Sequence, residues 1–263
     1  SKIICQTGRR GEKKLAAGEF FITAQAPPPG VDRMEYVLFS PVGGTDPISN
    51  ERDGAILHIC RHYRPACVEL YLSKEMLAFQ ETDDRYRQAV RRLAEEAGFS
   101  VQLRSVERLD LVNVHLFDHF YQEFEQLLHQ LHRDYPKHQI LVNLSSGTPA
   151  MKSALSVLAT LIDFPIVAVQ VASPKKSHNG RREDMKEFDL DLYWECNLDR
   201  DPAQYEDRCQ VLRSENLRAK LQRQAVEAHL DAYDYHAAWA VAQQMGDLQP
   251  DGARAQLEAA ELR

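Results

Sequence analysis

The sequence predicts an α/β fold in which helices cover both faces of a mostly parallel sheet. Short apolar runs rich in β-branched residues alternate with segments of helical length, which is the pattern of consecutive β–α–β units. The runs are apolar at successive positions, as expected for parallel strands that are buried on both sides. A length of 263 residues suits one large domain, or one domain with an appendage.

Strands and helices alternate from Met34 onward. Strands are expected at residues 36–39, 67–72, 99–106, 139–144 and 165–172. The intervening helices are expected at 53–63, 82–97, 117–134 and 149–162, where Gly98 ends the second helix and Pro136 stops the third. This order predicts a Rossmann-like architecture.

The ends of the chain differ in composition from the middle. Residues 187–196 alternate apolar and polar side chains, which predicts a half-buried antiparallel edge strand. Beyond Pro202 the spacing predicts helices at 205–222 and 225–245. We therefore expect three parts: a ligand-binding domain at 34–200, a helical linker or the start of an effector domain at 201–263, and an extension at 1–33. The extension is interpreted as a flexible segment or as sequence added upstream of a natural start at Met34.

Composition excludes several classes of protein. The formal net charge is −7, and residues 203–263 carry seven Lys and Arg against ten Asp and Glu, so a non-specific nucleic-acid binder is not expected. No apolar run approaches the roughly 20 residues of a membrane span, and no secretory signal opens the chain. Five cysteines without a C-x-x-C pair predict neither a disulfide framework nor a zinc ribbon, which fits a cytoplasmic protein.

No cofactor or metal is expected. His58 and His62 are four residues apart on a predicted helix and could bind a metal, but no third ligand is identifiable, so they are interpreted as part of a half-buried amphipathic face.

The loop after the first strand has the composition of a ligand-binding turn. Its sequence is Ser40-Pro41-Val42-Gly43-Gly44-Thr45-Asp46-Pro47. The two glycines permit a close backbone approach, and Ser40 and Thr45 supply hydroxyls. In open α/β sheets, ligands bind beyond the carboxyl ends of the strands, where the strand order reverses. A tight connection without a ligand is the alternative interpretation.

The loop after the fourth strand predicts an anion site. Asn143 and Leu144 lead into Ser145-Ser146-Gly147-Thr148-Pro149 and then into a helix. Thr148 suits the N-cap and Pro149 the first helical position, so free amides and hydroxyls converge at the positive end of the helix, with Lys152 one turn further. Neither G-x-x-x-x-G-K-[ST] nor G-x-G-x-x-G is present, and an ordinary capped helix is the alternative.

Both loops take part in a wider resemblance. Residues 39–47, 52–65, 143–152, 173–177 and 193–199 together resemble the CARF domain of the Csm-type accessory ribonucleases of type III-A CRISPR systems, continuously over 34–200. The resemblance implies a two-fold dimer that binds a cyclic oligoadenylate, either a tetra- or a hexa-adenylate, and thereby activates a C-terminal HEPN ribonuclease. The pair Arg133 and His138 has a suitable spacing for that ribonuclease, but Pro136 lies between them. We therefore expect the HEPN domain, and with it any RNA partner, to be missing from this chain.

The expected ligand contacts come from both loops and from a few lysines. The ligand-binding residues are expected to be Ser40, Pro41, Gly43, Gly44, Thr45, Asp46, Lys74, Asn143, Ser145, Ser146, Gly147, Thr148, Lys152, Lys175 and Lys176. Slow, metal-independent cleavage of the ring is expected, with Thr45, Ser146 and Thr148 orienting the ribose and the phosphate and Lys152 stabilising charge. Three alternatives remain: a binder that releases the ring intact, a CARF-type transcription regulator, and an unrelated nucleotide-binding α/β enzyme.

Overall fold

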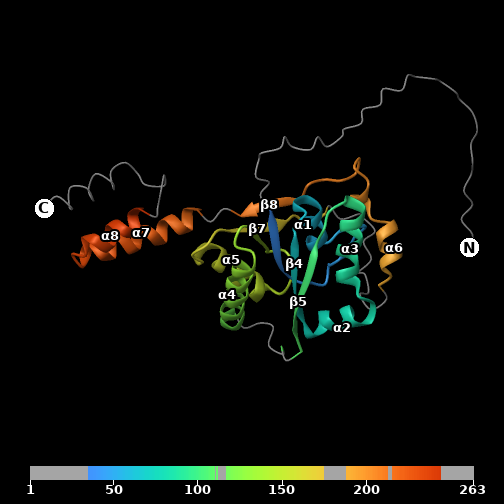
Figure 1. The fold of residues 1–263 in the computed structure, drawn as a ribbon, viewed down its shortest axis with the longest axis horizontal. Helices are drawn as coiled ribbons and strands as arrows, with labels where there is room; N and C mark the ends of the chain where they lie inside the picture. Colours follow the sequence, from blue (N-terminus) through green and yellow to red (C-terminus); the bar gives the residue numbers. More distant parts are fainter. Residues whose placement is uncertain (1–34, 110, 112–116, 175–187, 213–214, 244–263) are drawn as a thin grey trace, which may run out of the picture. The chain divides into compact units, whose positions relative to one another are not determined.

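The structure is a computed structural model that describes residues 35–109, 111, 117–174, 188–212 and 215–243 (Figure 1). The predicted extension at 1–33 lies outside these residues, and so do Lys175 and Lys176.

A six-stranded sheet forms the centre of the molecule. In chain order its strands are β1 (Tyr36–Pro41), β4 (Cys67–Ser73), β5 (Gln102–Arg108), β6 (Gln139–Asn143), β7 (Ile166–Val171) and β8 (Cys209–Leu212). They lie in the order β5-β4-β1-β6-β7-β8, and all neighbouring pairs are parallel except β7 and β8, which are antiparallel. The predicted fold class is confirmed, including the antiparallel edge strand.

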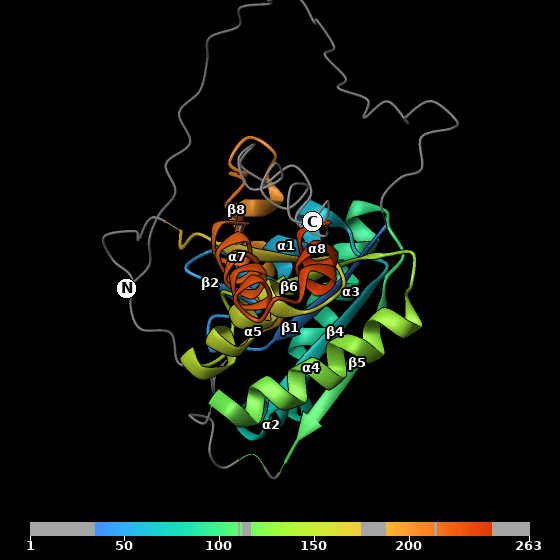
Figure 2. The ribbon, with the colours of Figure 1, turned by 90° about the vertical axis from the view of Figure 1, so that its left-hand side faces the viewer.

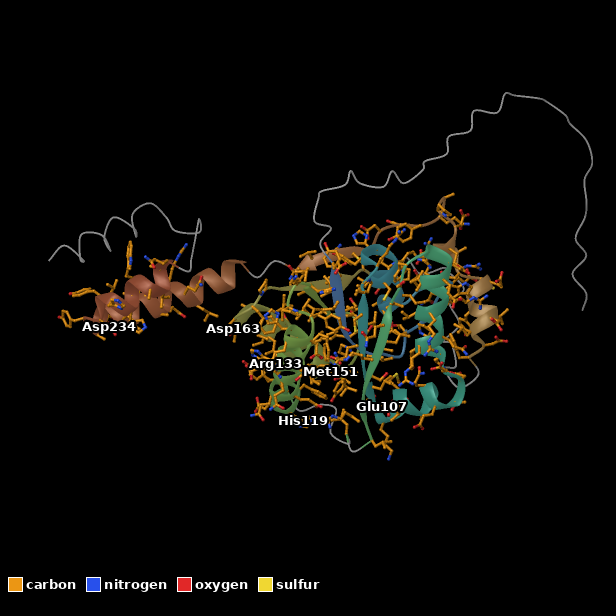
Figure 3. All side chains as sticks on the ribbon, viewed as in Figure 1. Glu107, His119, Arg133, Met151, Asp163 and Asp234 are labelled. Atoms are coloured by element: carbon orange, nitrogen blue, oxygen red, sulfur yellow. The ribbon has the colours of Figure 1, made fainter. Side chains whose placement is uncertain are left out.

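Helices cover both faces of this sheet. One face packs against α1 (Ala55–Tyr63) and α3 (Arg85–Ala97), and the other against α4 (Phe117–Asp134) and α5 (Pro149–Leu161) (Figure 1). Alternate residues of β1 divide between the two cores: Leu38 belongs to the α1–α3 core, and Phe39 belongs to the α4–α5 core. Figure 2 shows α4 crossing in front of β4 and β5, and side chains fill the space between the layers (Figure 3).

The edge strand is not the one that the alternating pattern predicted. Residue 187 lies outside the described residues, and residues 188–196 do not form a strand: Leu190–Glu195 is the helix α6, and the Asp189 carboxylate accepts from the backbone N–H groups of the first turn. In this helix Leu190 and the fully buried Trp194 lie one turn apart, so both pack on the α1–α3 core. The edge position belongs to β8, so the sheet continues past residue 200.

Two further predictions of helices are corrected. The segment 82–97 is divided at Asp84, whose φ of 53° ends one helix, α2 (Lys74–Asp83), before α3 begins. The predicted helices at 205–222 and 225–245 are instead α7 (Glu215–Asp231) and α8 (Tyr235–Gln243), because β8 takes up 209–212 and Tyr233, with a φ of 61°, turns the chain. Ala238 and Ala242 of α8 pack against α7.

A short antiparallel hairpin, β2 (Ile48–Ser49) and β3 (Arg52–Asp53), follows the loop after β1, and a 3₁₀ turn, η2 (Leu198–Arg200), follows α6.

None of the described helices combines the length and the hydropathy that a bilayer crossing requires.

Candidate ligand-binding site at the switch point of the sheet

The loops after β1 and β6 meet at the point where the strand order reverses. β4 and β5 extend the sheet to one side of β1, whereas β6, β7 and β8 extend it to the other, so the switch point lies between β1 and β6. A Cβ atom added at Gly43 would lie 2.9 Å from the backbone nitrogen of Gly147, which itself has a φ of 87°. Glycine at both positions therefore allows the two loops to touch.

A layer of buried polar side chains joins the two loops. The Asn143 side-chain amide donates to Ser40 Oγ at 2.9 Å and to Ser146 Oγ at 3.0 Å, and its oxygen accepts from the Ser145 backbone N–H at 2.8 Å. Ser40 Oγ in turn donates to the Pro41 carbonyl at 2.8 Å. Because the Asn143 side chain bonds to the end of β1 and to the loop after β6, it fixes the spacing between them.

Asp46 anchors the first loop and is completely buried. Its carboxylate accepts from the backbone N–H groups of Gly43 at 3.0 Å and Ile56 at 3.2 Å. Burial raises the pKa of Asp46, and hydrogen bonds from Ser146, Gly43 and Ile56, together with the charge of Lys152, act against that rise. The carboxylate therefore closes the loop onto the start of α1.

The first pocket beside these loops, called here the Lys152 pocket, has a volume of about 420 Å³. It contains three predicted residues, Thr45, Ser145 and Lys152. The rest of its lining was not predicted from the sequence and consists of Ser49, Asn50, Asp53, Gly54, Ala55, Leu144, Gln170, Val171, Ala172, Ser173, Pro174 and Arg208.

The second pocket, called here the Lys74 pocket, has a volume of about 700 Å³. Its predicted residues are Gly43, Gly44, Lys74, Gly147 and Thr148, and the others are Val42, Ser73, Glu75, Met76, Ala78, Leu111 and Met151. Thr148 is the N-cap of α5, as its position predicted: its side chain accepts from the backbone N–H of Met151, which Figure 3 labels.

The predicted site residues differ in their access to a ligand. Gly44, Thr45 and Lys74 are exposed; Gly43, Ser145, Gly147, Thr148 and Lys152 are half-buried; Ser40, Pro41, Asp46, Asn143 and Ser146 are buried. The exposed and half-buried groups can contact a ligand directly, and the buried ones hold the loops in place.

A buried cluster of charges lies against the Lys152 pocket and was missed by the sequence analysis. We call it the Arg208 cluster, and it consists of Arg52, Asp53, His58, Arg61, Asn197, Asp199 and Arg208. Asp199 accepts from Arg52 at 2.6 Å, from Arg208 at 2.8 Å and from the Asp53 backbone N–H at 3.0 Å. Burial raises the pKa of Asp199, but hydrogen bonds from His58 and Arg52 and the charge of Arg208 outweigh it and hold that pKa well below its usual range.

His58 belongs to this cluster rather than to a half-buried face. It is completely buried, its Nε2 accepts from the Arg208 backbone N–H at 2.9 Å, and its ring stacks on Tyr205. Asp53 and Asp199 lie close enough to His58 to share a metal ion, and so do Asp207 and Cys209. However, arginines already pair with Asp53 and Asp199, and His58 Nε2 already has a donor, so the donor set fits an ion-pair cluster.

Together, an open parallel sheet, two pockets at its switch point and hydroxyl-rich loops with lysines define a Rossmann-like domain of the nucleotide-binding class. Residues 104–209 match the family model of the Csm6 CARF domain, and residues 212–263 match that of the 6H domain of the CRISPR-associated protein Csm6. The chain thus carries the CARF and 6H domains of the Csm6 family.

Relatives of known identity agree with this assignment. The chain is 41% identical over 209 residues to the CRISPR system endoribonuclease Csm6 of Mycobacterium tuberculosis, covering 78% of this chain and 49% of that protein. It is 33% identical over 207 residues to the Csm6 endoribonuclease of Streptococcus thermophilus, covering 78% and 46%. A solved structure of Enterococcus italicus Csm6 bound to cyclic hexa-2′-fluoro-hexa-dAMP superimposes with a TM-score of 0.68 at 25% identity, over 86% of this chain and 54% of that one.

The chain spans about half the length of the curated relatives that it matches. Another Arg–His pair of suitable spacing, Arg223 and His229, was not predicted; it lies on α7, within the segment that matches the 6H domain. None of these matches is to a transcription regulator.

Proposed function

We propose that this chain is the sensor part of a CRISPR defence protein of the type III class and binds a cyclic oligoadenylate at the switch point of its sheet. Two observations support the proposal: the Lys152 and Lys74 pockets share the touching loops of the switch point, and a relative of the same fold is bound to a cyclic hexa-adenylate analogue. We therefore take the hexa-adenylate as the first candidate and the tetra-adenylate as its competitor.

The charges of the site suit such a ring. Each phosphate of the ring carries one negative charge, and Lys152, Lys74 and the positive end of the α5 dipole offer local positive charge despite the net charge of −7. We include Lys175 and Lys176, which follow the pocket residue Pro174 in the sequence, among the ring contacts.

The symmetry of the ring implies a dimer. A ring of identical adenylates has a two-fold axis, and an isologous homodimer presents each loop twice around such an axis. We propose that the ring lies across two copies of this chain. Ring binding then regulates the endoribonuclease activity for which the longer relatives are named, and RNA is a partner only through that activity.

We also propose that the bound ring is slowly cleaved without a metal. The ribose 2′-oxygen forms a bond to the adjacent phosphorus, the bond to the 5′-oxygen breaks, and the 2′-hydroxyl proton ends on that leaving oxygen. Thr45 and Thr148 orient the ribose and phosphate, Ser146 supports them from the buried layer, and Lys152 stabilises the developing charge.

Single-turnover incubation tests binding and cleavage together. Excess protein is mixed with cyclic hexa-adenylate in EDTA, the protein-bound fraction is separated by filtration, and its nucleotides are resolved by chromatography. We expect the ring to be retained and then converted to linear products that end in a 2′,3′-cyclic phosphate, because in-line attack requires only positioning and charge stabilisation. Retained but intact ring would refute the cleavage, and a ring that passes the filter would refute the binding.

A further inference from the structure

The wall of the Lys152 pocket is assembled from segments that are far apart in the sequence. Asp53 and Gly54 come from the end of the β2–β3 hairpin, Ala172 follows β7, and Arg208 directly precedes β8. Something other than chain connectivity must therefore hold these segments at a fixed separation.

Arg208 forms hydrogen bonds to the hairpin and to the segment after β7. Its guanidinium donates to the Ala172 carbonyl at 3.2 Å and to the Asp53 carbonyl at 2.9 Å. Its backbone carbonyl accepts from the Ala172 N–H at 2.9 Å, and its backbone N–H donates to His58 of α1. One residue, only 8% exposed, thus joins the hairpin, the segment after β7 and α1 around one pocket.

A second set of bonds fixes the guanidinium itself. Asp199 accepts from Arg208 at 2.8 Å, and it is held in place by Arg52 and by the Asp53 backbone N–H. Asn197 donates to the Asp53 carboxylate at 2.7 Å. Residues 52–54 and 197–199, which belong to two of the segments that carry the sequence resemblance, therefore meet at Arg208 through the Asp53–Asp199 contact.

We infer that Arg208 is a positioning residue of the ring site, which sets the width of the Lys152 pocket by tying Asp53 and Ala172 to Asp199. The inference rests on the proposed ring binding. The fork geometry is essential to it, because the two terminal nitrogens of the guanidinium reach different partners, and an ammonium group, as a compact point charge, does not reproduce that arrangement.

Ring affinity measured by calorimetry, well below the melting temperature, tests this inference. The variants are Arg208→Gln and Arg208→Lys, both expected to fold because Asp199 keeps Arg52 and the Asp53 N–H as donors. The control is Leu131→Ala, which removes buried side-chain volume from the α4–α5 core on the opposite face and lowers the melting temperature without touching either pocket.

We expect both Arg208 variants to bind cyclic hexa-adenylate about tenfold or more weakly than the wild-type chain, and Leu131→Ala to bind it normally. Full affinity in Arg208→Lys would show that charge alone suffices and would overturn the inference. An equal loss in Leu131→Ala would do so as well, because it would show a general effect of stability.

A measurement on the wild-type chain does not depend on the folding of any variant. We expect a bound ring to slow amide hydrogen exchange at Ala172, whose N–H donates to Arg208, by about tenfold. Unchanged exchange at Ala172 with the ring bound would overturn this inference but not the proposed function. Failure of the wild-type chain to bind any ring would overturn the proposed function and this inference with it.

Discussion

Asp199→Ala is expected to lower the free energy of unfolding by about 3–5 kcal/mol, the cost of breaking a buried ion pair by removing one partner. The substitution leaves the guanidinium groups of Arg52 and Arg208 without their shared carboxylate and removes the acceptor of the Asp53 backbone N–H. Urea unfolding followed by circular dichroism at neutral pH measures this loss.

The matched control is Asp191→Ala. The Asp191 side chain is 89% exposed although it pairs with Arg92 at 2.6 Å, so water screens the pair and the variant should unfold close to the wild-type midpoint. If Asp199→Ala also unfolds close to the wild-type urea midpoint, the Arg208 cluster does not hold the β2–β3 hairpin, η2 and the segment before β8 together.

The loss in Asp199→Ala should depend on pH. The folded-state pKa of Asp199 is depressed below the unfolded value of about 3.9, so its carboxylate contributes stability that is complete above that value and is lost as the pH falls toward the folded pKa. The difference between the wild-type chain and Asp199→Ala is therefore expected to shrink below about pH 4. The raised pKa of Asp46 acts in the opposite direction, because its contribution to stability is lost as the pH rises.

Lys152→Ala is expected to weaken binding of cyclic hexa-adenylate by roughly 1.5–3 kcal/mol, which is about 10- to 150-fold, since it removes a charge-assisted contact to phosphate. Lys152 is half-buried in its pocket, where screening by water is reduced. Lys137→Ala, which removes an exposed lysine that lines neither pocket, is the control. Equal affinity of the two variants would remove Lys152 from the ring site.

The sequence predicts the sheet well because its strands are continuous apolar runs, which few other structures can bury. The five parallel strands lie close to their predicted positions, and the two loops at the switch point follow from the glycines and from the N-cap at Thr148. Residues 187–196 mislead because their alternating pattern also places Leu190 and Trp194 on one side of a short helix, and only the contact with the core distinguishes the two structures.

The Arg208 cluster could not be predicted from local pattern. Its bonds join residues such as Asp53 and Asp199, which are 146 positions apart, and a charged side chain in a sequence is ordinarily a solvated one. The available signal was that Arg52-Asp53-Gly54 and Asn197-Leu198-Asp199 both fall in segments that carry the family resemblance. The missed lining of the Lys152 pocket, such as Asn50 and Gln170, likewise depends on which loops the fold brings together.

Native mass spectrometry of the chain mixed with cyclic hexa-adenylate tests the central claim most directly, because it reports binding and stoichiometry in one spectrum. Two protein chains with one ring is the expected complex. Cleavage to a 2′,3′-cyclic phosphate is an isomerisation, so the mass of the bound nucleotide should not change with time. Chromatography of the released nucleotide then separates the ring from its linear product. A spectrum that shows only free chains, or one ring on a single chain, would contradict a ring site shared across a two-fold dimer.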